Sequence, residues 1–457
     1  MLFGARGDLA RRKLYPGLYR LDAAGHLPEE YRVIGSGRHS PESVDAFRDD
    51  VREALAKTVD DLDEAVAERL LERLDFCASD ADDGQELADA VEAAASQLGE
   101  DTRRLVYLSV PPAAMEPMIG MLGRTGIADG ARIVLEKPFG TDLESARSLQ
   151  SALDEVTDEE HVFRIDHFLG KEAVQNILAL RFANGLLEPA WHRTHVESVQ
   201  IDVPETLRME GRGSFYEATG CLRDMVSTHL FQVLGFVALE PPVVFDAESL
   251  RHEKSKVFQA VRPIDTDRVV LGQYDGYRDE DDVDPDSDVE TFVALEVRVD
   301  TDRWQGVPFV LRTGKALAET RRTVTLRFRQ PPESRFPDRP GPDELVLELG
   351  DSPEVTVDLS AKRPGPAFDL VPAHLRLNLA EDDPDDQPLE AYERLLLDVM
   401  HGDHMLFTRA DEVERLWELC DPVLAADLDV ESYEPGSWGP EAAIDLAPGG
   451  WRLPEDA

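Results

Sequence analysis

The chain has 457 residues, of which 42% are hydrophobic, so it is long enough for two globular domains with a core in each. Its 93 acidic and 48 basic residues give a net charge of −45, which excludes nucleic acid as a partner. Apolar runs fall well short of the roughly 20 residues that span a bilayer, so no membrane association is predicted.

The three cysteines fit neither a disulfide framework nor a metal site, and the start of the chain lacks the pattern of a signal peptide. A cytoplasmic location without a bound metal is therefore predicted. Because the acidic residues are interleaved with apolar ones, a solvated acidic surface suited to high salt is favoured over a disordered acidic protein. At molar salt the Debye length is about 3 Å, so repulsion between surface charges is largely screened. These features predict a halophilic source.

Residues 1–165 alternate short apolar runs with amphipathic stretches. Buried strands are predicted at residues 32–36, 104–110 and 132–136, a helix at 11–21, and amphipathic stretches at 41–72 and 84–98. Strands that alternate with helices are typical of a doubly wound parallel sheet. Ligands of such sheets bind at the carboxyl ends of the strands.

The segment Phe-Gly-Ala-Arg-Gly-Asp-Leu-Ala at residues 3–10 follows the start of a strand and precedes a helix. Gly4 and Gly7 allow a tight turn and a close approach of phosphate to the helix N-terminus. This spacing lacks the third glycine of the full dinucleotide fingerprint, so an ordinary strand–helix turn remains an alternative. Only three residues precede Gly4, so either the true start lies upstream or the first strand is weak.

Arg38 follows the second strand, where an NAD-preferring site typically carries an acidic residue. Its planar guanidinium suits a 2′-phosphate, which favours NADP. Pro111 and Pro112 end the strand at 104–110 in a loop that can lie along the nicotinamide side of a cleft. Glu136-Lys137-Pro138 ends the next strand and resembles an element of sugar and polyol dehydrogenases.

After residue 170 the pattern changes. A helix is predicted at 172–184, strands at 196–203, 291–299, 323–328, 344–349 and 375–379, and helices at 388–400 and 409–420. Many strands with few helices between them predict a large, mostly antiparallel sheet. The acidic run at 279–288 is predicted to be a solvated loop. The predicted fold class is therefore α/β plus α+β, with a Rossmann-like domain at 1–165 and a larger domain at 166–457.

Residues 164–172, Arg-Ile-Asp-His-Phe-Leu-Gly-Lys-Glu, combine a carboxylate, an imidazole and an ammonium. Asp166 can orient an imidazole, His167 can move a proton or bind an anion, and Lys171 can hold a phosphate. Gly170 lets the backbone turn or approach a ligand closely.

Three further polar clusters lie at residues 205–213, 222–230 and 310–317. In the second, Asp224 and His229 are five residues apart on a predicted helix whose polar end faces a cleft. Each cluster alone has a plain alternative, because a single helical His is more often a core residue and Lys315 has many acids to pair with. Together, however, the clusters offer an anion-binding pair, acceptors for sugar hydroxyls and an imidazole.

The clusters and the nucleotide-binding segments occur in the order found in glucose-6-phosphate dehydrogenases, and the chain resembles that family over nearly its whole length. Further matching segments lie at residues 181–184, 271–274, 291–295, 392–398 and 436–440. The resemblance implies hydride transfer from C1 of β-D-glucose 6-phosphate to NADP+. It also implies that His229 is the general base and that Asp166 holds its imidazole.

The resemblance further implies that His167 and Lys171 bind the substrate phosphate and that Glu205 and Asp224 bind the sugar hydroxyls. It places three more lysines at the substrate: Lys13, Lys137 and Lys315. It assigns cofactor binding to the glycine-containing turn and three later positions, namely Gly4, Gly7, Asp8, Leu9, Arg38, Pro111 and Lys137. A homodimer or homotetramer built through the large sheet is expected.

The chain departs from the family pattern at several positions. Phe168 stands where Tyr is usual, so one hydroxyl to the phosphate is missing, and Thr228 replaces the usual Asn before His229. Thr320 stands where Lys or Arg is frequent, and Arg321 is a candidate substitute. Arg6 replaces Ser or Thr and is a candidate contact to a cofactor phosphate. Two rival hypotheses are a different sugar oxidoreductase and a catalytically inactive binding protein.

Overall fold

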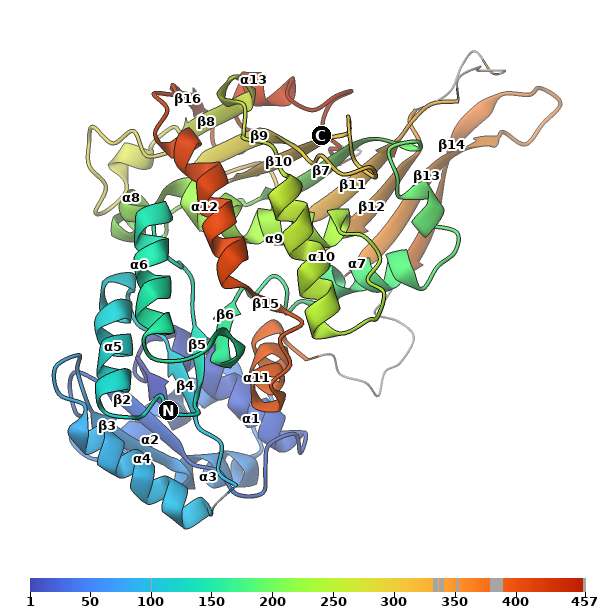
Figure 1. Ribbon diagram of the computed structural model, residues 1–457. Helices are drawn as coiled ribbons and strands as arrows, with labels where there is room; N and C mark the ends of the chain where they lie inside the picture. The colour runs from blue at the N-terminus through green and yellow to red at the C-terminus, as the bar shows by residue number, and fades with distance from the viewer. Residues whose placement is uncertain (100, 332–335, 337–340, 351–352, 379–388, 455–457) are drawn as a thin grey trace. The chain divides into compact units, whose positions relative to one another are not determined.

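The computed structural model describes residues 1–99, 101–331, 336, 341–350, 353–378 and 389–454 (Figure 1). The chain forms two compact units. Unit 1 consists of Met1–Gly170, Phe245–Arg251 and Pro388–Glu414. Unit 2 consists of Lys171–Val244, His252–Gln387 and Arg415–Ala457. The predicted domain boundary after residue 165 lies five residues before Gly170, where the chain first leaves unit 1. Two later segments of the chain again belong to unit 1.

Unit 1 contains a seven-stranded sheet in the order β15-β6-β5-β4-β1-β2-β3. The strands are β1 (Leu2–Phe3), β2 (Val33–Gly37), β3 (Leu74–Ala78), β4 (Leu105–Leu108), β5 (Arg132–Leu135), β6 (Val162–Ile165) and β15 (Phe407–Thr408). Strands β1 to β6 are all parallel, and β15 pairs with β6 in the antiparallel sense. The predicted doubly wound parallel sheet is confirmed. Its strand order reverses between β1 and β4, which is where such sheets bind ligands.

Unit 1 begins its helices with a π-helical turn, η1 (Ala10–Leu14), which continues directly into α1. Its α-helices are α1 (Tyr15–Ala23), α2 (Val44–Thr58), α3 (Glu64–Glu72), α4 (Gln85–Leu98), α5 (Pro112–Arg124), α6 (Leu143–Asp154) and α11 (Ala391–His401). The stretch at 41–72 forms two helices because Ser43 and Asp63 each cap a helix start with a side-chain oxygen.

Helix α11 lies more than 360 residues after α1 in the chain and packs against it. Arg20 of α1 forms an ion pair with Glu393 of α11 at 2.8 Å, and Glu393 is buried. This contact and the pairing of β15 with β6 explain why residues 389–414 belong to unit 1, although the sequence prediction assigns them to the second domain.

Unit 2 contains a nine-stranded sheet in the order β14-β13-β12-β11-β7-β10-β9-β8-β16. The strands are β7 (Val196–Pro204), β8 (Val269–Tyr274), β9 (Phe292–Arg298), β10 (Pro308–Gly314), β11 (Thr323–Phe328), β12 (Glu344–Glu348), β13 (Glu354–Lys362), β14 (Leu370–Asn378) and β16 (Val430–Tyr433). The pairs β7–β10 and β8–β16 are parallel, and the other pairs are antiparallel. The predicted large, mostly antiparallel sheet is confirmed.

The helices of unit 2 include a second π-helical segment, η4 (Leu222–Leu230), which follows α8 and packs on β10. The others are α7 (Glu172–Phe182), α8 (Gly213–Cys221), α9 (Phe231–Ala238) and α13 (Glu441–Ile444). Helices α10 (Ala247–Ala260) and α12 (Ala410–Leu424) begin in unit 1 and end in unit 2. Short 3₁₀ turns are η2 (Glu159–His161), η3 (Glu188–Ala190), η5 (Thr266–Arg268) and η6 (Tyr277–Asp279).

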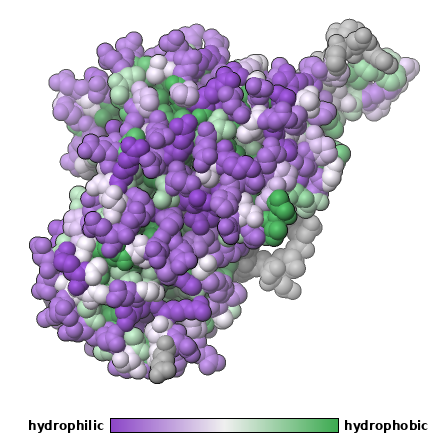
Figure 2. Space-filling model, viewed as in Figure 1, coloured by the Kyte–Doolittle hydropathy of each residue, from purple (hydrophilic) through white to green (hydrophobic). Residues whose placement is uncertain are grey.

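Residues 280–288 form an irregular loop, as predicted for the acidic run. Two other predicted elements reach residues outside the described ranges, namely Leu379 at the end of one strand and Pro388 at the start of one helix. Among the described residues, no helix is both long and apolar enough to cross a membrane. The face of the molecule in Figure 2 is mostly hydrophilic, with small, scattered hydrophobic areas.

A charged network is buried inside the sheet of unit 2. The parallel register of β7 and β10 places Arg312 opposite Asp202, and the guanidinium binds both carboxylate oxygens at 2.8 and 2.7 Å. Arg321 donates to the same carboxylate at 3.0 Å. Trp438 and Trp451 lie against the Arg312 guanidinium, which is 1% exposed. Arg312 therefore serves the core of the sheet.

Candidate active site

Neighbouring parallel strands of unit 1 end in predicted ligand-binding residues. Arg38 follows β2, Gly4 follows β1, Pro111 lies in the loop after β4, Lys137 lies after β5, and Asp166 follows β6. Because parallel strands point the same way, their carboxyl ends form one edge of the sheet. The topology therefore brings these five positions to the same edge of unit 1.

The turn after β1 depends on Gly4. Its φ is +71°, and a Cβ atom there would lie 1.9 Å from the carbonyl oxygen of Ser109. The Gly7 N–H donates to the Gly4 carbonyl oxygen at 2.8 Å and closes the turn. Gly4 is thus required for the loops after β1 and β4 to pass each other, in addition to any close approach of a ligand.

A cavity of about 200 Å³ lies between the loops after β1 and β2. Its lining includes Gly4, Gly7 and Arg38, together with Arg6 and His39. A glycine turn at a strand end beside an exposed guanidinium fits a phosphate-bearing nucleotide. The chain therefore offers a suitable set of donors for the 2′-phosphate end of NADP.

Three other predicted cofactor residues, Asp8, Leu9 and Pro111, do not line this cavity. Asp8 is exposed and pairs with Arg12 at 2.9 Å, and Leu9 immediately precedes η1. Pro111 is exposed and immediately precedes α5. Arg6 also pairs with Asp50 at 3.1 Å, so its guanidinium already has a carboxylate partner.

The end of β5 carries a carboxyl group between two phenols. Glu136 accepts a hydrogen bond from the Tyr107 hydroxyl at 2.5 Å and a second from Tyr392 of α11. The residue is only partly buried, but its carboxyl is desolvated, which raises the pKa of Glu136 from 4.5 to about 7. The next residue, Lys137, is half-buried.

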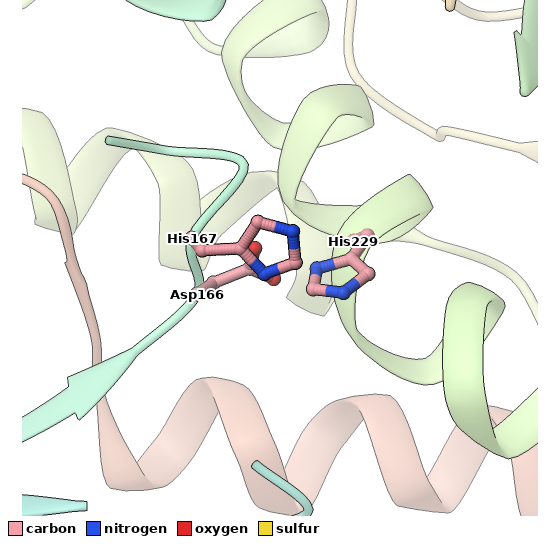
Figure 3. Close-up of side chains that lie close together, drawn as sticks. All are labelled: Asp166, His167 and His229. Atoms are coloured by element: carbon pink, nitrogen blue, oxygen red, sulfur yellow. The ribbon is translucent and has the colours of Figure 1, made fainter. Parts of the chain in front are cut away.

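The turn after β6 is organised by Asp166. This side chain is buried, and its Oδ1 accepts the Phe168 N–H at 3.0 Å. The His167 ring lies parallel to the Tyr392 ring at a centroid distance of 6.2 Å and meets the buried Phe168 ring edge-on at 5.2 Å. In Figure 3, Asp166 and His167 project from the coil that follows β6.

Gly170 has a packing function that the sequence does not reveal. A Cβ atom there would lie 2.7 Å from the carbonyl oxygen of Ala391 at the start of α11. The glycine therefore allows close backbone packing within unit 1. The next residue, Lys171, is the N-cap of α7 and the first residue of unit 2, so the nonapeptide at 164–172 extends from one unit into the other.

In unit 2, Asp224 and His229 lie on the π-helical segment η4. A π-helix closes its hydrogen bonds between residues i and i+5, so residues five apart follow one another along the axis. In an α-helix the same spacing would direct the two side chains to different faces. Both are buried, and His229, drawn on its helical segment in Figure 3, is 1% exposed. Such turns are frequent at functional sites.

The start of η4 is held by Glu290, which lies outside the polar clusters that the sequence shows. Its Oε1 accepts the Leu222 N–H at 3.0 Å, and burial raises the pKa of its carboxyl. Gly220 has a φ of +70°, and a Cβ atom there would lie 2.5 Å from that Oε1. Glu290 follows an acidic run that looks solvated, so no sequence signal distinguishes it.

Glu205 and Lys315 meet because β7 and β10 are parallel neighbours. Pro204 and Gly314, the last residues of these strands, are in register, so the residues that follow them lie side by side. The Lys315 ammonium forms an ion pair with the Glu205 carboxylate and lies 5.9 Å from the centre of the Tyr216 ring. Asp224 acts electrostatically on the same tyrosine, so these predicted substrate residues gather around Tyr216.

Two residues that depart from the family pattern, Thr228 and Thr320, form hydrogen bonds with other residues of unit 2. The Thr228 hydroxyl donates to the Asp224 carbonyl oxygen at 3.2 Å within η4. The Thr320 hydroxyl bonds Thr206 at 2.9 Å. Arg321, the candidate substitute for a basic residue at this place, binds the buried Asp202 instead.

Lys13 lies on η1 and pairs with Glu390 at 3.3 Å. Both line a cavity of about 600 Å³ in unit 1, with Arg20 and Lys57 among the other residues. The cations of this cavity each have a carboxylate partner. A substrate contact by Lys13 would therefore compete with Glu390.

Comparison with known families covers almost the whole chain. Residues 1–176 match the NAD-binding domain of glucose-6-phosphate dehydrogenase, and residues 178–450 match its C-terminal domain. The glucose-6-phosphate 1-dehydrogenase of Mycolicibacterium smegmatis is 40% identical, with 98% of this chain and 95% of that protein covered. The glucose-6-phosphate 1-dehydrogenase 6, cytoplasmic, of Arabidopsis thaliana is 39% identical, with coverages of 98% and 90%.

Solved structures agree with these relatives. A crystal structure of glucose-6-phosphate 1-dehydrogenase from Mycobacterium avium is 39% identical, with a TM-score of 0.90 and coverages of 99% of this chain and 97% of that chain. A structure of glucose-6-phosphate dehydrogenase in complex with its substrate glucose-6-phosphate is 34% identical, with a TM-score of 0.92 and coverages of 99% and 98%.

Proposed function

The chain belongs to the glucose-6-phosphate dehydrogenase family, and from that premise we propose which residues carry out the family's reaction. The reaction is transfer of hydride from C1 of β-D-glucose 6-phosphate to NADP+, which yields 6-phosphoglucono-1,5-lactone. The protein is accordingly an NADP-dependent oxidoreductase of carbohydrate metabolism.

In this proposal, His229 removes the proton from the C1 hydroxyl. Its buried position on a π-helical segment supports the role most directly, because such a position fixes the imidazole. An imidazole is a suitable base for alcohol oxidation since its pKa lies near neutrality. Asp166 orients this imidazole and stabilises its protonated form. NADP+ supplies the acceptor for the hydride.

The remaining residues bind and position. His167 and Lys171 bind the substrate phosphate, and Glu205 and Asp224 bind the sugar hydroxyls. Three lysines, Lys13, Lys137 and Lys315, supply positive charge around the two anionic ligands in a chain of net charge −45. The Glu205–Lys315 ion pair supports this arrangement, because it holds a carboxylate for the sugar hydroxyls and an ammonium for the anionic ligands at adjacent strand ends.

The function is tested by comparing NADP+ reduction with glucose 6-phosphate and with free glucose, over a series of KCl concentrations. A strong preference for glucose 6-phosphate is expected, with the highest rate in molar KCl. Comparable rates with free glucose would favour a different sugar oxidoreductase. Retained cofactor binding without turnover at any KCl concentration would instead identify an inactive binding protein.

Location and assembly form part of the proposal. A cytoplasmic location follows the Arabidopsis relative, which is described as cytoplasmic. The edge strand β14 and its neighbour β13 expose Leu359, Leu375 and Leu377, which supports a homodimer or homotetramer formed through the large sheet. Light scattering at the salt optimum measures the number of subunits.

Replacing Lys171 by Ala is expected to raise the KM for glucose 6-phosphate roughly 10- to 100-fold, with little change in kcat. One charge-assisted hydrogen bond to phosphate contributes about 1.5–3 kcal/mol, and the reacting C1 atom lies at the other end of the sugar. The matched control is Lys256→Ala, since Lys256 is exposed on α10, where it pairs with Glu253. An unchanged KM would refute the phosphate contact.

Replacing Arg38 by Ala is expected to lower kcat/KM for NADP+ about 10- to 100-fold and to change that for NAD+ less than about threefold. The guanidinium can form charge-assisted bonds to a 2′-phosphate, which NAD+ lacks. Arg32→Ala is the control, because Arg32 is exposed just before the opposite end of β2. Equal losses with both cofactors would show that Arg38 does not read the 2′-phosphate.

A further inference from the structure

Glu136 has no role in the mechanism above, yet the charges of two residues in that mechanism, Lys137 and Asp166, act on it. It immediately precedes Lys137, and its carboxyl accepts hydrogen bonds from Tyr107 of β4 and Tyr392 of α11. The charge of Asp166, at the end of β6, also acts on it. All these residues belong to unit 1. Glu136, which follows β5, therefore connects β4 and α11 through its two hydrogen bonds and immediately precedes Lys137.

The contact with Tyr392 extends to the predicted phosphate ligand. The rings of Tyr392 and His167 lie within 10° of parallel. Because a phenol that donates to Glu136 has a defined ring orientation, the surface against which His167 packs is also defined. The hydrogen bond between Glu136 and Tyr392 thus influences the position of the His167 ring, although Glu136 itself acts only through Tyr392.

The protonation state of Glu136 changes these bonds. An ionised carboxylate accepts a hydrogen bond from each phenol, and burial raises the pKa of both phenols, so both remain donors at neutral pH. A protonated carboxyl carries a proton of its own, which must be donated to an acceptor. One phenol then has to change its orientation, and the attraction between Glu136 and Lys137 is lost.

We propose that Glu136 is a positioning residue for substrate binding, which in its ionised form orients Tyr392 and thereby His167, and holds Lys137 by its charge. This role rests on the proposed function. It assigns the pH dependence of substrate binding to a residue that does not contact the substrate. Since the pKa of Glu136 is about 7, wild-type KM for glucose 6-phosphate should rise as the pH falls from 8 to 6.

The test is steady-state kinetics of Glu136→Gln and Tyr392→Phe from pH 6 to 8. Gln has the size of Glu but cannot ionise, and its amide must donate to one of its neighbours. We expect Glu136→Gln to raise the KM about tenfold at pH 8, to leave kcat within about threefold, and to flatten the pH dependence of KM. The substrate phosphate takes up a proton near pH 6 in every variant, so the comparison between variants removes that contribution.

Tyr392→Phe should also raise the KM for glucose 6-phosphate. The KM of the double variant should exceed that of either single variant only slightly, because both substitutions break the same chain of contacts from Glu136 through Tyr392 to His167. Glu144→Gln on α6, where Glu144 is exposed, is the control and should match the wild type. A raised carboxyl pKa means that ionised Glu136 lowers stability above pH 7, so Glu136→Gln should not lower the melting temperature at pH 8.

A wild-type KM in Glu136→Gln, or KM increases that multiply in the double variant, would overturn the positioning role. A large loss of kcat together with a lower melting temperature in Glu136→Gln would overturn it as well, because both changes together would indicate a purely structural residue. Absence of turnover in the wild type would refute the proposed function instead. The two failures are therefore distinguishable.

Discussion

Replacing His229 by Asn is expected to lower kcat by about 10³- to 10⁴-fold while the KM for glucose 6-phosphate changes little. Asn keeps a polar side chain of similar size, but it has no proton acceptor with a pKa near neutrality. A loss of this size corresponds to roughly 4–5.5 kcal/mol of transition-state stabilisation. NADPH absorbance under saturating substrate measures it.

The control is His195→Asn, because His195 is exposed just before β7 in the same unit. It should retain turnover within about twofold. Circular dichroism of both variants shows whether the chain keeps its secondary structure. Turnover of His229→Asn within about tenfold of the wild type would remove His229 from the role of base.

Replacing Asp202 by Ala is expected to destabilise the protein by about 3–5 kcal/mol. The substitution leaves Arg312 and Arg321 inside the sheet without their shared carboxylate, and a buried charge that loses its partner costs several kcal/mol. The two tryptophans beside Arg312 cannot replace an anion, since a cation–π contact contributes about 0.5–2 kcal/mol. Urea denaturation followed by circular dichroism measures the loss.

The matched control is Asp300→Ala, which breaks the exposed pair between Asp300 and Arg262. An exposed pair contributes about 0–1 kcal/mol, and high salt screens it further. The loss for Asp202→Ala should therefore be similar in 0.1 M and 2 M KCl, whereas the small loss for Asp300→Ala should shrink. A loss below about 1 kcal/mol for Asp202→Ala would contradict the account of the buried network.

Several elements are predictable because their pattern is local. The predicted strand at 32–36 is β2 at Val33–Gly37, and the predicted strand at 323–328 is β11. β2 contains the β-branched Val33 and Ile34, and β11 contains the β-branched Thr323, Val324 and Thr325, which suit a pleated, buried surface. The positions of Arg38 and Lys137 at strand ends follow from the predicted strands at 32–36 and 132–136 together with the rule for parallel sheets. Strand β6 (Val162–Ile165), which Asp166 follows, is not among the predicted strands.

Other elements are not predictable from local pattern. The pattern at 310–317 predicts a polar cluster, but most of the segment is strand β10, in which Arg312 is buried. A guanidinium in a sequence looks like a surface or ligand-binding group unless its carboxylate partner is known. That partner, Asp202, lies 110 residues earlier and is brought opposite Arg312 only by strand register.

The role of Gly170 illustrates the same limit. The sequence allows either a turn or a close approach to a ligand, whereas the structure shows close packing against Ala391. Glu290 and Tyr392 were not identified as positioning residues for a related reason. Each acts through a contact with a residue at least 68 positions away, and neither contact leaves a local pattern.

The sequence by itself determined the alternation of strands and helices, the glycine turn, the acidic charge and the ordered motifs that indicate the family. These depend on residues near one another in the chain, because propensity, periodicity and capping act over a few residues. Tertiary structure alone decided that α11 joins unit 1, that Glu205 meets Lys315, and that Glu136 lies between two phenols. Such contacts depend on strand order, register and helix packing, through which residues far apart in the chain become neighbours.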